Sequence, residues 1–220
     1  SAMAGFTEPL TKALVPNLGQ LFPVAKPRLV EGWPFVNVYT YTYVLAYRTD
    51  MVKAIPGSWK VFLDAKWQKS IGMYDDGIGF TPVAAKLSGG SIPDDMAPVW
   101  EFYRTLKPNI GLLADDAELT QALVEGTTPL QCCIISNVLQ ARRRGAPVAW
   151  VVPEEGVVLE RDAMWIPRNL PWETTYWGMK YINLALSREA QEIWCGRLGT
   201  PPVNRQAKFP DHMKYDPAFF

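Results

Sequence analysis

Short apolar runs alternate with helix-forming segments through the middle of the chain, and this alternation constrains the fold more than any other feature. The runs typical of buried strands are 71–73, 110–113, 130–135 and 148–152. Helices are predicted near 80–87, near 96–106, behind the Asp115-Asp116 pair and near 137–144. Strands that alternate with helices in this way favour a mainly parallel sheet, so the sequence predicts an α/β fold.

The longest predicted strand covers residues 35–47, which are rich in β-branched and aromatic side chains. Two extended pieces are predicted at 157–160 and 163–167, on either side of Arg161 and Asp162. Two amphipathic helices should follow, at 172–186 and 188–198. We expect the three tryptophans of these helices, Trp172, Trp177 and Trp194, to lie in the core.

The charge balance excludes partners that are held by bulk electrostatics. Lys plus Arg is 22 and Asp plus Glu is 22, so the net charge argues against a nucleic acid or an anionic membrane. One histidine and three cysteines without metal-ligand spacing predict no metal site, and we expect no cofactor. Nine Trp, nine Tyr and nine Phe supply either core volume or flat walls for an organic ligand.

The stretch from Ser58 to Asp76 carries a spaced motif, with Trp59, Leu63 and Trp67 ahead of the apolar run 71–74. It resembles, without a gap, a stretch of the spermidine/putrescine-binding proteins of ABC importers. Further short motifs resemble the same family in the same order, at 106–109, 124–126, 141–142, 145–147, 152–156, 162–167 and 199–204. A series of motifs in fixed order is more specific than any one of them.

The resemblance implies a type II periplasmic binding protein, in which two α/β lobes joined by crossing strands close on a small molecule. The implied organisation is a remnant of the first lobe with a crossing strand at 1–42, the second lobe at 43–160, a return segment of the first lobe at 161–205, and a tail at 206–220. The family's first β/α units would precede Ala4, and a longer stretch would follow Phe220. We therefore expect a first lobe truncated at its N-terminus, which would favour self-association through the apolar surface left open.

The same resemblance implies a periplasmic location, an ABC permease as partner and no catalysis. It places Asp76 on a loop that faces the ligand and Asp162 beside the second crossing strand, where both would pair with ammonium groups through charge-assisted hydrogen bonds. The alternatives are a turn-and-cap role for Asp76 and a turn between two strands for Asp162.

Where the resembled proteins line the cleft with aromatic residues, this sequence has Ile134, Glu160 and Thr200. Gly79 replaces a carboxylate, whereas Glu160 adds one. The crossing strand contributes Tyr39, Thr40 and Tyr41, whose hydroxyls and rings suit an organic ligand but also suit ordinary strand packing. These residues together favour a small organic cation of the polyamine type, with a different, shorter or more polar amine as an alternative.

Two other functions remain open on the same fold. Cys132 or Cys133 could be the nucleophile of a transferase, or the chain could be a sensor module. The transferase lacks a histidine base near the predicted strands, because His212 lies in the tail. Two small buried side chains are the favoured interpretation of the cysteines.

Overall fold

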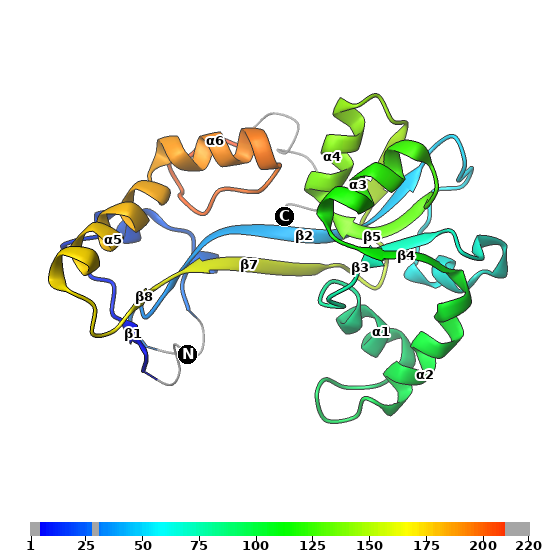
Figure 1. The fold of residues 1–220 in the computed structure, drawn as a ribbon, viewed down its shortest axis with the longest axis horizontal. Coiled ribbons are helices and arrows are strands. Elements are labelled where there is room, and N and C mark those ends of the chain that lie inside the picture. The colour runs from blue at the N-terminus through cyan, green and yellow to red at the C-terminus, as the bar shows by residue number, and fades with distance from the viewer. Residues whose placement is uncertain (1–4, 28–30, 210–220) are drawn as a thin grey trace. The chain divides into compact units, whose positions relative to one another are not determined.

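The computed structural model describes residues 5–27 and 31–209, so His212 and most of the predicted tail lie outside the described part. Its contacts divide the chain into two units (Figure 1). Unit 1 combines the residues up to Tyr41 with those from Glu160 onward, and unit 2 is Thr42–Leu159. Among the described residues, no helix is both long and apolar enough to cross a membrane.

Unit 2 is built on a mixed sheet whose strand order is β4-β3-β5-β2-β6. Its strands are β2 (Val36–Arg48), β3 (Ile71–Tyr74), β4 (Ile110–Ala114), β5 (Leu130–Ile134) and β6 (Val148–Val151). β3 pairs in parallel with β4 and with β5, as predicted. β2 lies between β5 and β6 and is antiparallel to both, so the four predicted strands run in one direction, as expected of a mainly parallel sheet, and β2 runs against them. β6 runs parallel to β5 but is hydrogen-bonded to β2, which lies between them.

Helices cover this sheet, and their ends follow local sequence signals. They are α1 (Thr81–Ser88), α2 (Ala97–Leu106), α3 (Asp116–Glu125) and α4 (Ile135–Arg143), with short 3-10 helices at Trp59–Leu63, Ala65–Trp67 and Lys107–Asn109. Ser58 begins the first 3-10 helix by accepting a hydrogen bond from the Lys60 N–H, and Asp115 begins α3 by accepting from Ala117 and Glu118.

An aromatic cluster forms the core of unit 2 on the α1 side. Trp59, Phe62 and Phe80 are almost completely buried, and their ring centroids lie 5.4–5.5 Å apart. Edge-to-face and stacked rings at this distance add to the free energy of simple burial. Unit 2 therefore has a closed core of its own.

Unit 1 has less sheet and more 3-10 structure. Its elements are β1 (Thr7–Glu8), 3-10 helices Pro16–Gln20 and Pro23–Ala25, β7 (Val158–Met164), β8 (Ile166–Pro167), α5 (Trp172–Ala185) and α6 (Arg188–Leu198). β1 pairs antiparallel with β8, and β7 pairs with β2. The two extended pieces predicted on either side of Arg161 and Asp162 are one strand up to Met164, because β7 runs through both residues, so the alternative of a turn at Asp162 is wrong.

The core of unit 1 is aliphatic and joins its two chain segments. Val36 and Val38 of β2 pack with Met179 and Ile182 of α5, on the same side as Leu18. The predicted burial of Trp172 and Trp177 is wrong, since these side chains are 69% and 66% exposed. Their helical period was correct, but the period alone did not identify which face is buried.

Candidate functional site

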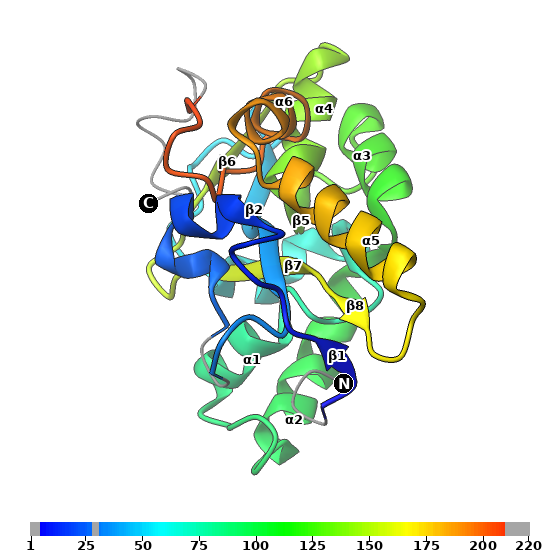
Figure 2. The ribbon, with the colours of Figure 1, turned by 90° about the vertical axis from the view of Figure 1, so that its left-hand side faces the viewer.

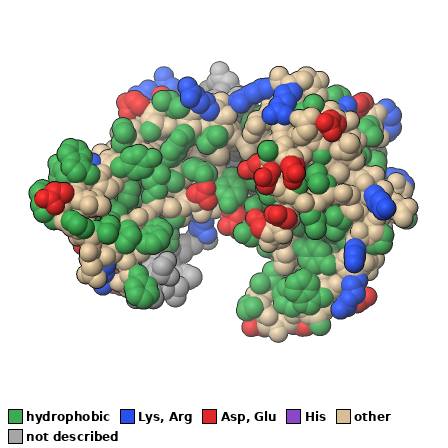
Figure 3. Space-filling view, viewed as in Figure 1, with side chains coloured by type: hydrophobic (Ala, Val, Ile, Leu, Met, Phe, Trp, Pro, Cys, Tyr) green, Lys and Arg blue, Asp and Glu red, His purple; other side chains and the backbone are tan. Residues whose placement is uncertain are grey.

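Polar side chains gather in unit 2 where the parallel strands β3, β4 and β5 end. Asp75 and Asp76 follow β3, and Asp115 and Asp116 follow β4. The segments 74–79, 114–118 and 134–137 contain no lysine or arginine. Figure 3 shows acidic side chains clustered on this part of unit 2. Open α/β sheets bind ligands at the carboxyl ends of their strands, so this edge is the candidate site of unit 2.

Asp76 is exposed and shapes the loop in which it lies. Its Oδ1 accepts a hydrogen bond of 2.8 Å from the Ile78 N–H, as in an Asx turn. The neighbouring Gly79 has no room for a side chain, because a Cβ there would lie 2.1 Å from Cδ1 of Tyr43. The Tyr43 ring thus occupies the space that a carboxylate at position 79 would need.

A hydrogen-bonded network that the sequence did not predict fixes Asp116. The Tyr74 hydroxyl donates to the Asp116 carboxylate and lies 2.8 Å from Oδ1 of Asn137. Nδ2 of Asn137 donates to the Asp116 carbonyl oxygen at 2.9 Å and to Oγ1 of Thr120 at 3.0 Å. Burial raises the pKa of Tyr74, and its bond to Asp116 raises that pKa further, so the hydroxyl keeps its proton. The only sequence signal was the Asp115-Asp116 pair, which also fits a helix start.

Aromatic surface adjoins these carboxylates. The Tyr43 ring meets the Tyr74 ring edge-on, with centroids 5.4 Å apart and planes at 89°. In the β2–β5 register, Tyr43 lies opposite Ile134, which is partly buried. Ile134 therefore lies beside an aromatic residue in the sheet, although it is itself aliphatic.

The candidate residues of unit 1 lie mainly on β7 and β2. Glu160 and Asp162 are two residues apart on β7, so they share one face of the strand, and Arg161 points to the other. The Tyr39 hydroxyl donates to the Asp162 carboxylate. This contact joins two predicted ligand residues that are 123 positions apart in the chain.

Tyr39 also organises the aromatic side of this group. Its ring centroid lies 6.3 Å from that of Tyr41 and 5.6 Å from that of Trp194, with the Trp194 plane at 76°. The sequence placed Trp194 in the core; it packs partly buried against that core and also against Tyr39. An acidic group with aromatic side walls is the arrangement that suits an alkylammonium ion.

Two predicted hydroxyl residues of unit 1 are buried. Thr40 is 3% exposed and, by strand alternation, points away from Tyr39 and Tyr41. Thr200 is 6% exposed, and its Oγ1 has no hydrogen-bond partner among the described residues. Pro202, two residues on, bridges to Tyr39 of β2. Thr200 thus brings an unsatisfied buried hydroxyl into the segment that pairs with Tyr39, and such a group costs free energy until it is paired.

The cysteines do not have the environment of a nucleophile. Cys132 and Cys133 are 1% and 0% exposed on β5. Burial raises the pKa of Cys132, and the neighbouring Cys133 and Asp76 charges add to the rise. Burial likewise raises the pKa of Cys133, with Asp116 contributing. Because the thiolate is the reactive form, both residues are inert thiols in this setting.

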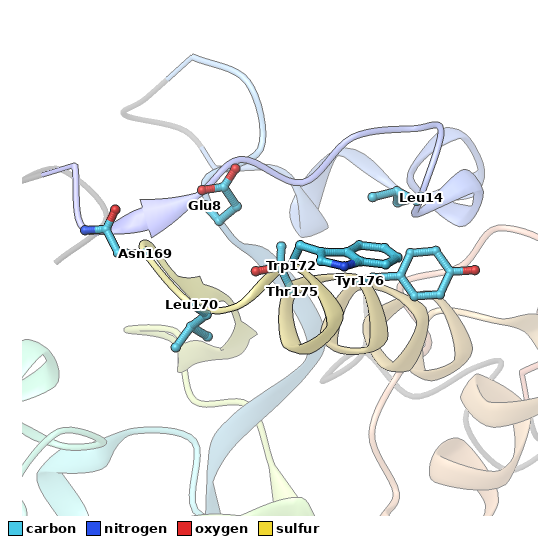
Figure 4. A pocket seen from close by; sticks show the side chains of 7 residues that line it. All are labelled: Glu8, Leu14, Asn169, Leu170, Trp172, Thr175 and Tyr176. Atoms are coloured by element: carbon cyan, nitrogen blue, oxygen red, sulfur yellow. The ribbon is translucent and has the colours of Figure 1, made fainter.

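Two surface pockets lie away from the predicted residues. One, of about 670 Å³, is in unit 1 and is lined by Glu8, Leu14, Asn169, Leu170, Trp172, Thr175 and Tyr176 (Figure 4). The other, of about 580 Å³, is in unit 2 between Met51 and Trp67. Neither is lined by any of the eight predicted ligand residues.

The solved structures that resemble this chain share its fold. A putative spermidine/putrescine ABC transporter protein of Listeria monocytogenes is 18% identical, with a TM-score of 0.84 over 99% of this chain and 69% of that one. The spermidine/putrescine substrate-binding protein of Streptococcus pneumoniae is 20% identical, with a TM-score of 0.81 over 99% and 69%. An ABC transporter protein of Clostridium perfringens is 20% identical, with a TM-score of 0.78 over 98% and 70%. These likenesses confirm the predicted α/β fold of the type II periplasmic binding proteins.

The sequence itself decides the family. No curated protein matches the chain. The family model described as bacterial extracellular solute-binding protein matches residues 2–220, which is almost the whole chain. The chain therefore belongs to the bacterial extracellular solute-binding proteins, the solute-binding components of ABC transporters, and not to a family of enzymes.

Proposed function

We propose that this protein binds a small organic cation of the polyamine type in the periplasm and delivers it to an ABC permease. The carboxylates proposed to pair with ammonium groups are Asp76 in unit 2 and, in unit 1, Glu160 and Asp162. The observation that carries the proposal is the contact of the Tyr39 hydroxyl with the Asp162 carboxylate, because it combines charge and aromatic surface at one point.

The acidic edge of unit 2 supports a cation. Asp76 and Asp116 follow two parallel strands, and Tyr43 and Tyr74 supply aromatic edges beside them. We add Asp116 and Tyr43 to the proposed ligand residues on this ground. Ile134 would contact the carbon skeleton from the same edge, opposite Tyr43 in the sheet.

In unit 1, Tyr39 and Tyr41 would flank the ligand's carbon skeleton. Thr200 would contribute its hydroxyl, which lacks a protein partner among the described residues. Thr40 is a supporting residue in this proposal, because its side chain is buried on the other face of β2.

An anionic ligand would need a basic side chain, but the guanidinium of Arg48 is already bound to other groups of the protein. Arg48 binds Asp50 at 2.7 Å and the carbonyl oxygens of Leu123 and Val124 at 2.9 and 2.7 Å. Arg161 points away from the face that carries Glu160 and Asp162. Two of the similar solved structures are named for spermidine and putrescine, although others are named for GABA or were solved with fructose-6-phosphate.

Calorimetry with diamines, polyamines and quaternary amines tests the proposal. Asp162→Asn should weaken binding of the best amine by well over tenfold, since losing a charge partner of this kind costs ~2–5 kcal/mol. Tyr39→Phe should weaken binding less, because the carboxylate and the ring remain.

Asp94→Asn is the matched control, because it removes an exposed carboxylate from the 91–95 loop of unit 2. It should leave the affinity unchanged. If no cation binds, or if Asp162→Asn binds as well as the unchanged protein, the amine proposal is wrong, while membership of the family stands.

A further inference from the structure

The segment that follows β2 in unit 2 lies away from the candidate cation site. Strand β2 runs between β5 and β6 (Figure 2), and its last residues, Tyr47 and Arg48, pair with Leu130 and Val148 at the N-terminal ends of those strands. The segment after Arg48 therefore starts at the edge of the sheet opposite the carboxyl ends of β3 and β5. A ligand held by this segment would not compete with one held at the strand ends.

This segment encloses the unit 2 pocket of about 580 Å³, a volume in the range of sites for small organic molecules. The wall is mainly apolar, with Met51, Ile55, Val61 and Trp67 among its residues. None of the described residues that line it is acidic. Ile55 and Met51 are 73% and 47% exposed, so a ligand in the pocket would cover apolar surface that now faces water.

The charged side chains of the pocket wall are two lysines, Lys53 and Lys66. The Lys53 ammonium donates to the carbonyl oxygen of Asp50 at 2.6 Å, and an ammonium has three donors, so it can bind further acceptors. The Lys66 ammonium lies 5.4 Å from the centroid of the Trp67 ring and pairs with Asp64 at 2.7 Å. That ion pair is exposed and contributes little to stability, so Lys66 can exchange Asp64 for the anionic group of a ligand.

The indole of Trp67 adds an unsatisfied hydrogen-bond donor to the wall. Its Nε1 is buried and has no acceptor among the described residues. A buried N–H without a partner costs free energy until it is paired, and an indole nitrogen can only donate. An oxygen of a ligand would supply the missing acceptor after a small shift of the ring, because Nε1 has almost no exposed surface. A cation could not satisfy this donor.

We propose that this pocket is a second binding site, for a small organic anion that joins a carboxylate or sulfonate to a flat apolar body. The ammonium groups of Lys53 and Lys66 bind the anionic group, and one of its oxygens accepts a hydrogen bond from Trp67. Ile55 and Val61 contact the apolar body. An organic cation, by contrast, meets two like charges in this wall and no carboxylate among the lining residues. The pocket therefore selects the charge opposite to that of the proposed transport ligand.

Calorimetry of the 220-residue chain with naphthalene-1-sulfonate and with 1-naphthylmethylammonium tests the proposal, because the two probes share a ring system and differ in charge. We expect the sulfonate to bind at least about tenfold more tightly than the ammonium. Lys53→Gln combined with Lys66→Gln should weaken sulfonate binding about 3- to 10-fold, since both ammonium groups are near solvent. Ile55→Glu changes an exposed side chain and should weaken it at least about tenfold, because it places a negative charge in the wall.

Lys107→Gln is the matched control, because it removes an exposed lysine of unit 2 that does not line the pocket, and it should change nothing. Asp162→Asn should also leave sulfonate binding unchanged, which separates this site from the proposed amine site. In nuclear magnetic resonance spectra the indole N–H signal of Trp67, identified with Trp67→Phe, should move with the sulfonate and stay in place with the ammonium.

Equal affinities for the two probes overturn the proposal, because the pocket then binds the ring and not the charge. Sulfonate binding that neither Ile55→Glu nor the double lysine variant weakens also overturns it, since the probe is then bound elsewhere. The same conclusion follows if the sulfonate does not bind at about 10 mM.

Discussion

Unit 2 and unit 1 are assembled from the chain in different ways. Unit 2 is one continuous stretch of chain, with a five-strand path in its sheet and an aromatic cluster beneath α1. Unit 1 is assembled from two segments more than 100 residues apart, and its own sheet pairs only Thr7–Glu8 with Ile166–Pro167. Unit 2 thus buries its aromatic cluster within itself, whereas unit 1 leaves Trp172 and Trp177 of α5 exposed.

The two units also present their carboxylates differently. In unit 2 the acids lie just after strands, in a loop or at the start of α3, and buried Asn137 holds Asp116 in place. In unit 1 the acids lie on the strand β7 itself, and Tyr39 holds Asp162. Asp116 depends on the hydrogen bonds of Asn137 for its position, whereas Glu160 and Asp162 are positioned by the backbone of β7.

The largest expected difference concerns stability. Phe80→Ala should lower the free energy of unfolding of unit 2 by ~3–5 kcal/mol, because it leaves a cavity between Trp59 and Phe62. Trp177→Ala on α5 should change stability by less than about 0.5 kcal/mol in dilute solution. Urea unfolding followed by circular dichroism measures both. Equal losses for the two variants would mean that Trp177 is covered within the single chain.

Much of this contrast could be predicted from sequence where the signal is local. The apolar runs at 71–73 and 110–113 predicted β3 and β4, because short apolar segments between turn residues have few other uses. The helix ends were also local, since Ser58 and Asp115 act as caps. The insertion of β2 between β5 and β6 was not predictable, because strand pairing depends on residues that are distant in sequence.

The same difference between local and long-range signals applies to the candidate site. Asp76 and Asp162 were singled out through a resemblance, and the contact of Tyr39 with Asp162 joins two of the predicted residues. Asn137 and Trp194 were missed because each looks like an ordinary helix residue until a distant side chain, Tyr74 or Tyr39, is placed beside it. The exposure of Trp177 was missed because an aromatic residue at helical spacing usually marks a core.

The reaction rates of the buried cysteines compare how readily the two units open locally. Cys132 and Cys133 lie on a central strand of unit 2, whereas Cys195 lies on α6 of unit 1, where burial raises its pKa to about 12. All three are buried, so a thiol reagent reaches them only when the structure opens. We expect Cys195 to react at least about tenfold faster than the other two, which corresponds to an opening free energy lower by about 1.4 kcal/mol.

Mass spectrometry after timed alkylation gives the three rates, and denatured protein supplies the reference in which all three react alike. Rapid labelling of Cys132 or Cys133 in the folded protein would contradict the closed core of unit 2. It would also return these thiols to consideration as reactive groups.

The smallest expected effect is a pH dependence of stability that Glu155 gives to unit 2. Glu155 ties the end of unit 2 back to its start, since its carboxylate accepts hydrogen bonds from the Ser58 hydroxyl and from the Trp59 N–H, the latter at 3.1 Å. Burial alone would raise the pKa of Glu155, but these hydrogen bonds outweigh it and lower that pKa. A lowered folded-state pKa means stability that is present above the unfolded value of about 4.3 and is lost as pH falls through the folded value. The corresponding tie in unit 1, Asn17 to Asn183, does not titrate.

Glu155→Gln should therefore destabilise unit 2 at pH 6 by less than about 1 kcal/mol, because the carboxylate is only partly buried and solvent screens its charge. The difference from the unchanged protein should disappear at an acid pH below the lowered folded-state pKa, where that carboxylate is protonated in both states. Urea unfolding at the two pH values measures it, and Glu154→Gln, at the exposed neighbouring position, is the matched control. A loss that persists unchanged in acid would show that Glu155 acts through its shape and not through its charge.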